Sequence, residues 1–195
     1  MSTWTSRVAA LLLAVTLGGC DETTGLPFAA GSGPARERLA QVSLAGGQVV
    51  MAAPEGYCFD RASLRRGSGG FAMMARCDTL GVEGFFGTRP LAIVTVTTTP
   101  QEQGAPLPSP AAIAASAGGK LVDSAKSGRL VLAQLSGGGT LEGVSATHWR
   151  GVYSVGKHLV GVSLYAPEGS RALGREGARL LSALAAGSQG AAAAQ

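Results

Sequence analysis

Residues 148–166, "HWRGVYSVGKHLVGVSLYA", indicate most strongly what kind of fold this chain adopts. Two runs of alternating apolar residues flank Gly156-Lys157, a pattern typical of two antiparallel strands joined by a tight turn. If this dipeptide forms a two-residue turn, Val155 pairs with His158, and side chains alternate between the two faces of the sheet. One face would then carry an apolar stripe of core residues: Trp149, Tyr153, Val155, Val160, Val162 and Leu164.

Several other segments also favour strands. β-Branched and aromatic residues bounded by turn residues are typical of strands, and residues 91–99, "LAIVTVTTT", show this pattern most clearly. A second hairpin is expected around Ser127-Gly128. The strands are expected within residues 42–54 (two strands around a Gly-Gly turn), 70–77, 91–99, 120–125 and 129–135.

Two segments predict helices. Ser109 is a typical N-cap and Pro110 suits the first helical position, so a short helix should run through Ala117. Ser170 is a second candidate N-cap, for a longer helix that stops at Gly187. That helix would carry a stripe of apolar residues formed by Leu173, Leu180, Leu181 and Leu184. The expected fold class is therefore α+β: a single antiparallel sheet with both helices packed on one face.

The first residues resemble a bacterial export signal. Val8 to Leu17 is an apolar run that is too short to span a bilayer but fits the core of a secretory signal. The run ends in Leu17-Gly18-Gly19-Cys20, which resembles the lipobox of bacterial lipoproteins. The resemblance implies that residues 1–19 are removed and that Cys20 carries the lipid. An ordinary secretory signal with an incidental cysteine is the alternative.

The lipobox implies an organisation and a location. Residues 20–41 would form the lipidated cysteine and a flexible tether rich in Gly, Ser, Thr, Ala and Pro, residues 42–186 one domain, and residues 187–195 a frayed tail. The domain would stand on the periplasmic face of a bacterial membrane. Asp21 resembles a signal that keeps some lipoproteins in the inner membrane.

Charge argues against a nucleic-acid partner. The formal net charge is +4, and the basic residues are spread along the chain instead of forming a stripe. A local cluster consists of Arg61, Arg65, Arg66 and Arg76. This cluster is a candidate for contacts with anionic lipid headgroups, and a solvated surface is the alternative.

Cys58 and Cys77 predict a structural disulfide, because thiols of exported proteins meet oxidising conditions. Their spacing is unlike the Cys-x-x-Cys of redox-active pairs, and a metal site would need more ligands nearby. Residues 53–77, "APEGYCFDRASLRRGSGGFAMMARC", resemble a group of uncharacterised exported proteins of alphaproteobacteria, and no activity follows from this resemblance. The order of elements is similar to that of the Mog1/PsbP-like α/β sandwich, which is a likeness of fold alone.

Catalytic patterns are incomplete. Ser154-x-x-Lys157 matches the nucleophile motif of penicillin-binding proteins, but it would lie in a hairpin, and the motif's partner sequences are missing from the chain. His148 and His158 would point to opposite faces of the sheet. Residues 67–70, "GSGG", are similar to a phosphate-binding loop but lack the following Gly-Lys-Ser/Thr.

We therefore expect no enzymatic activity, no cofactor and no metal. The sequence favours a membrane-anchored interaction or accessory module whose partners are the membrane and an envelope protein. The alternatives are a lipoprotein that binds a small molecule or lipid between the sheet and the final helix, and, less favoured, an enzyme of unknown class.

Overall fold

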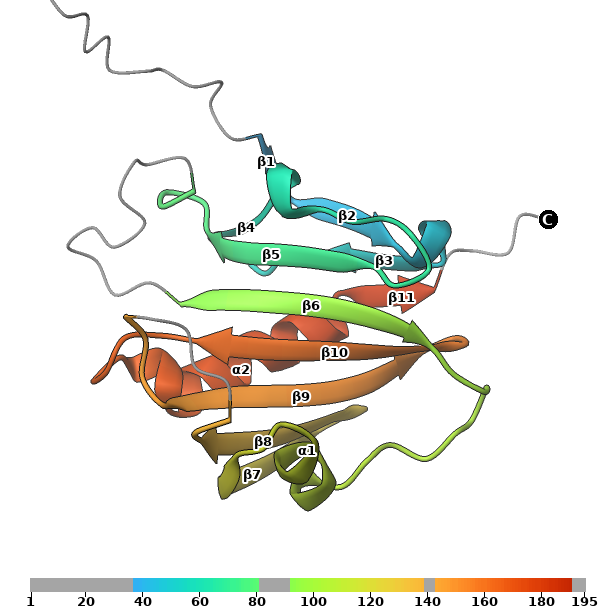
Figure 1. The fold of residues 1–195 in the computed structure, drawn as a ribbon. Helices are drawn as coiled ribbons and strands as arrows, with labels where there is room; N and C mark the ends of the chain where they lie inside the picture. Colours follow the sequence, from blue (N-terminus) through green and yellow to red (C-terminus); the bar gives the residue numbers. More distant parts are fainter. Residues whose placement is uncertain (1–36, 81–91, 139–142, 191–195) are drawn as a thin grey trace, which may run out of the picture. The chain divides into compact units, whose positions relative to one another are not determined.

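The computed structural model describes residues 37–80, 92–138 and 143–190 (Figure 1). The predicted signal sequence, Cys20, Asp21 and most of the predicted tether lie outside these ranges. Within the described residues, no helix combines the length and the apolar character needed to cross a membrane.

An eight-stranded antiparallel sheet forms the main layer (Figure 1). Its strands, in spatial order, are β1 (Arg38–Leu39), β4 (Tyr57–Asp60), β5 (Phe71–Arg76), β6 (Ile93–Pro100), β10 (His158–Tyr165), β9 (Thr147–Val155), β8 (Leu130–Ser136) and β7 (Lys120–Ser127). A second, three-stranded sheet has the order β11 (Ser188–Gly190), β3 (Val49–Ala52), β2 (Gln41–Leu44). The α+β class is confirmed, and the expectation of a single sheet is wrong.

The second sheet arises because both edges of β3 are occupied. One edge pairs with β2, and the other pairs with β11, where Ser188 lies opposite Met51. β3 therefore has no edge left to pair with the large sheet. The apolar side chains of β2 and β3 pack against the large sheet instead. Val42, Leu44, Val49 and Met51 share one buried core with Phe59 and Val94 of the large sheet.

The limits of the folded part differ from those expected at both ends. Arg38 and Leu39 already pair with β4, so ordered structure begins before residue 42. Ser188 to Gly190 form β11 where a frayed tail was expected from Gly187 onward. Leu39 packs against the core and Ser188 is buried within it. Burial and pairing with distant strands, rather than local sequence, order these two short segments.

The β9–β10 hairpin has the predicted register. Val155 pairs with His158 and Trp149 with Leu164. Gly156 adopts a φ of 55°, as the first position of such a two-residue turn requires. The predicted apolar stripe is confirmed, because all six of its residues lie in the buried core: Trp149, Tyr153, Val155, Val160, Val162 and Leu164.

The β7–β8 hairpin turns one residue later than expected. Ser127 pairs with Leu130, which leaves Gly128 and Arg129 as the turn. Gly128 has a φ of 56°, a conformation that glycine adopts without the steric cost other residues meet. The preference of the turn for a glycine at its first position explains the shift.

The two helices lie on opposite faces of the large sheet. The short helix α1 (Pro110–Ser116) is capped as predicted, by the Oγ of Ser109, which accepts the N–H of Ala112 at 3.2 Å. α1 packs Ile113 and Ala114 against Ala133 and Leu135 of β8. Figure 1 shows α1 in front of β8 and the C-terminal helix behind β9 and β10. The expectation that both helices share one face is therefore wrong, because alternation along β8 gives each face apolar side chains to cover.

The C-terminal helix begins later than expected. Ser170 caps a single 3-10 turn (η3, Arg171–Leu173) by accepting the N–H of Ala172. Gly174 then interrupts the helical backbone, and α2 runs from Arg175 to Ala186. Leu181 and Leu184 are fully buried in the core, as the leucine pattern predicts.

Candidate functional site

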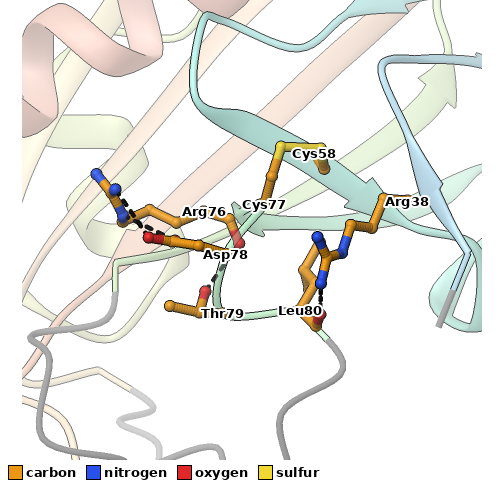
Figure 2. The surroundings of a disulfide bond; sticks show 7 residues. All are labelled: Arg38, Cys58, Arg76, Cys77, Asp78, Thr79 and Leu80. Atoms are coloured by element: carbon orange, nitrogen blue, oxygen red, sulfur yellow. Dashed lines mark hydrogen bonds and ion pairs between the residues drawn. A yellow bond between two sulfur atoms is a disulfide. The ribbon is translucent and has the colours of Figure 1, made fainter. Parts of the chain in front are cut away.

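Cys58 and Cys77 form a disulfide between β4 and the residue that follows β5 (Figure 2). Their Cα atoms lie 4.9 Å apart. The predicted pairing is confirmed. Because β4 and β5 are neighbours in the sheet, the bond joins two strands that are already hydrogen-bonded to each other.

Polar contacts hold residues 78–80, which follow Cys77, in place (Figure 2). The guanidinium of Arg76 donates two hydrogen bonds of 3.1 Å to the carboxylate of Asp78. The hydroxyl of Thr79 donates to the carbonyl of Arg76 at 2.8 Å, and Arg38 donates to the carbonyl of Leu80 at 3.1 Å. Two carboxylates near the disulfide also make local contacts: Asp78 binds Arg76, and Asp60 accepts the N–H of Ala62 at the start of a 3-10 turn (η2, Arg61–Ser63).

Three of the four predicted headgroup arginines gather, and the fourth lies apart. Arg61, Arg65 and Arg66 line a depression of about 670 Å³ together with Leu64, Gly67 and Gly69. Arg76 lies opposite Tyr57 at the far end of β5. A strand rises about 3.3 Å per residue, so Arg76 is roughly 16 Å along the sheet from Phe71, which pairs with Arg65.

The arginines in the depression differ in their partners. Arg61 forms an ion pair of 2.7 Å with Glu37, and both side chains are more than half exposed, at 55% and 58%. The exposure makes this pair weak, because water screens it. Arg65 donates to the carbonyls of Ala62 and Leu64. Within the described part of the chain, neither Arg65 nor Arg66 has a carboxylate partner, so both charges are available to an external anion.

The two histidines lie on opposite faces of the sheet, as the register predicted. His148 is buried and stacks on Tyr165, with ring centroids 5.1 Å apart. Its Nδ1 donates to the carbonyl of Ala146 at 3.3 Å, and its Nε2 accepts from Arg150 at 3.3 Å. This arrangement requires the neutral imidazole. Burial lowers the pKa of His148, the carbonyl of Ala146 raises it, and the charge of Arg150 lowers it.

His158 belongs to a second depression, of about 480 Å³, at the turn between β9 and β10. Lys157, Gln101, Gln48 and Ser68 supply polar groups around it. The remaining described lining residues are Ala45, Gly46 and Pro100, so no carboxylate is among the described residues that line it. This depression and the arginine-lined one lie on either side of the loop formed by residues 66–70, because Ser68 lines one while Gly67 and Gly69 line the other.

The Ser-x-x-Lys pattern lies in a hairpin. Ser154 is in β9, and its Oγ accepts a hydrogen bond of 2.6 Å from the side-chain amide of Gln101. Lys157 is in the turn. In the described ranges no group of three or more His, Cys, Asp or Glu side chains could hold a metal ion.

The His158 depression was not predicted from the sequence. Its residues come from four separate segments, and Gln48, Ser68, Gln101 and His158 meet only after the strands pair. The local signals were the "GSGG" of residues 67–70 and the Gly156-Lys157 turn, which are far apart in the chain. Nothing local indicates that they adjoin.

Comparisons with known proteins give little guidance. No family model matches the sequence, and no curated protein matches it significantly. A crystal structure from Bacteroides thetaiotaomicron VPI-5482 resembles the chain with a TM-score of 0.48 and 13% sequence identity. The match covers 82% of this chain and 51% of the other, so this chain spans about half the length of that protein. A likeness this distant says nothing about activity, ligand or partner.

Proposed function

We propose that this protein is a lipid-anchored, non-catalytic interaction module of the bacterial cell envelope. The observation that carries the proposal is where the chain enters the folded part. Glu37, the first described residue, accepts the backbone N–H of Arg61 at 3.2 Å and binds its guanidinium at 2.7 Å. The segment that leads back toward Cys20 therefore joins the domain beside the arginine-lined depression.

The position of this junction favours a particular orientation. Sixteen residues separate Cys20 from Glu37, and a coil of about that length has an r.m.s. reach on the order of 23 Å. A lipid on Cys20 would hold the surface near Glu37 close to the bilayer. Arg61, Arg65 and Arg66 would then lie at the height of the headgroups. Each basic residue near an anionic surface contributes about 1 kcal/mol, so the cluster would orient a domain that the lipid already retains.

A small-molecule or lipid-binding protein is the second candidate. The place first expected for a ligand, between the sheet and α2, is occupied by the fully buried side chains of Leu181 and Leu184. The depression beside His158 is the feature that favours this candidate, because it gathers polar side chains in a concave surface.

The intact mass of the protein extracted from membranes tests the anchor. A chain that starts at Cys20 and carries acyl groups is expected. An unmodified chain that starts at another residue would refute the lipid anchor. A stable anchor needs more than one acyl chain, so the added mass should correspond to at least two.

Cross-linking in living cells tests the interaction role. The tagged protein and a Cys20→Ser form would be recovered and their cross-linked proteins compared. We expect an envelope protein to be captured by the lipidated form and to be lost or strongly reduced with Cys20→Ser. Capture of no protein by either form would contradict the interaction role and favour the ligand-binding candidate.

A further inference from the structure

The depression beside His158 offers one cation and several hydrogen-bonding groups in one place. It lies where the end of β6, the β9–β10 turn, the loop between β2 and β3, and the loop of residues 66–70 come together. Lys157 contributes an ammonium group, Ser68 a hydroxyl, and Gln48 and Gln101 side-chain amides. None of the described lining residues carries a carboxylate that would neutralise the ammonium group of Lys157.

The backbone of His158 is held in the sheet by pairing with Val155 and Pro100, and no described residue hydrogen-bonds to its imidazole ring. Its residue is 7% exposed. Every fully buried side-chain nitrogen or oxygen in the described ranges has a hydrogen-bond partner. A ring nitrogen of His158 without such a partner must therefore reach solvent, and the depression it lines is where the ring meets solvent. The imidazole is thus a fixed group that can bind a ligand.

The loop of residues 66–70, which contains Ser68, is hydrogen-bonded to the rest of the fold at both of its ends. The carbonyl of Arg66 accepts the N–H of Gly46 at 2.8 Å, and the N–H of Gly70 donates to the Oγ1 of Thr98 at 2.9 Å. These two anchors fix the backbone that carries Ser68 into the lining of the depression.

We propose that this depression is a binding site for a phosphate group, held by Lys157, His158 and Ser68. A phosphate carries negative charge and several strong acceptor oxygens, which match one ammonium, one imidazole and one hydroxyl. The same chemistry could come from a soluble phosphate compound or from the headgroup of an anionic lipid. The phosphate site does not depend on a lipid at Cys20, so this proposal is independent of the proposed anchor.

The chain has two histidines, which gives the test an internal control. The side-chain NMR signals of His148 and His158 in the full chain would be followed at pH 7 during titration with inorganic phosphate at constant ionic strength. We expect a saturable shift of the His158 signals and no shift of His148, which is buried on the opposite face. Lys157→Gln should weaken binding roughly tenfold, because it removes a charged hydrogen bond. Lys126→Gln, in the exposed strand β7, should leave binding unchanged.

The source of the phosphate is tested with vesicles. If phosphatidylglycerol vesicles shift the His158 signals in a Lys157-dependent manner and phosphatidylcholine vesicles do not, the ligand is an anionic headgroup. If inorganic phosphate shifts them and vesicles have no effect, the ligand is a soluble phosphate compound. If His158 shifts with neither, or if Lys157→Gln and Lys126→Gln bind phosphate equally, the proposal is wrong.

Discussion

At the scale of single residues, Ser188 links the C-terminal strand to the core. Its hydroxyl lies 2.8 Å from the phenolic oxygen of Tyr153 and donates to the carbonyl of Leu184 at 2.8 Å. Arg129 donates to the carbonyls of Ala185 and Ser188, and its guanidinium lies 5.3 Å from the centre of the Tyr153 ring. Burial raises the pKa of Tyr153 to about 12, so the phenol remains neutral and needs a hydrogen-bond partner.

Ser188→Ala should therefore destabilise the fold. Ser188 is only 3% exposed, so water cannot easily replace the lost hydroxyl beside Tyr153. Leaving a buried polar group unsatisfied costs about 1–3 kcal/mol, and urea unfolding should show a loss of this size. Ser136→Ala is the matched control, because Ser136 is exposed in β8. Equal stabilities of the two variants would contradict the role assigned to Ser188.

His148 should make stability depend on pH. Burial lowers its pKa in the folded state below the value near 6.5 of the unfolded chain. As the pH falls below about 6.5, the unfolded state binds a proton that the folded state does not, so the free energy of unfolding decreases. The decrease in the free energy of unfolding is complete below the folded-state pKa. It amounts to about 1.4 kcal/mol for each unit by which the pKa of His148 is lower in the folded state than in the unfolded state. NMR titration should give a pKa below 6.5 for His148. A value above 6.5 would contradict the assignment.

At the scale of elements, Gly177 sets how closely α2 approaches the preceding 3-10 turn. A Cβ at this position would lie 1.9 Å from the carbonyl oxygen of Ala172, a distance that no real contact allows. Gly177→Ala should thus cost about 1–3 kcal/mol, although alanine is the better helix former by nearly 1 kcal/mol. At Gly174 the same Cβ would lie 3.6 Å from the carbonyl oxygen of Arg171. Gly174→Ala should be close to neutral in thermal unfolding, and an equal loss at both positions would rule out the steric explanation.

The disulfide between β4 and β5 should stabilise the fold against unfolding. The cysteines are 19 residues apart, and closing a loop of this length in the unfolded chain is worth about 3 kcal/mol in the chain-entropy model. Cys58→Ala with Cys77→Ala should lower the denaturation midpoint accordingly, and reduction of the native protein should have the same effect. An unchanged denaturation midpoint under reducing conditions would contradict the stabilising role of the disulfide.

Elements with local signals were predictable, and those that depend on distant pairing were not. Ser109-Pro110 starts α1, and Gly156-Lys157 sets the β9–β10 register, because a cap and a two-residue turn are decided by adjacent residues. β11 consists of Ser188, Gln189 and Gly190, which have low strand propensity, and it exists because β3 offers a free edge. The second sheet was missed for that reason.

The same distinction applies to the candidate sites. Cys58 and Cys77 were correctly paired because the folded part contains no other cysteine. Of the four arginines considered for headgroup contacts, Arg61, Arg65 and Arg66 are near one another in sequence and line one depression. Arg76 lies at the other end of β5, because an intervening extended strand separates it from them. The depression at His158 combines residues from four segments and had no local signature.

At the scale of the whole molecule, we expect the arginine-lined depression, but not the edge strand β7, to contribute to membrane binding. β7 is at the edge of the large sheet farthest in strand order from β1, where the chain enters. Its two lysines, Lys120 and Lys126, are exposed, as are Arg65 and Arg66. If the entry side faces the bilayer, charge at the depression should affect binding to anionic lipid, and charge at β7 should not.

Partitioning of residues 21–195 onto phosphatidylglycerol vesicles tests this asymmetry without the lipid. Each basic residue near an anionic surface is worth about 1 kcal/mol, so Arg65→Gln with Arg66→Gln should weaken partitioning roughly thirtyfold, and added salt should weaken the unaltered chain in the same direction. Lys120→Gln with Lys126→Gln removes the same charge and should change partitioning less than threefold. Equal losses in the two double variants would mean that the net charge of the protein, not one surface, governs its attraction to the membrane.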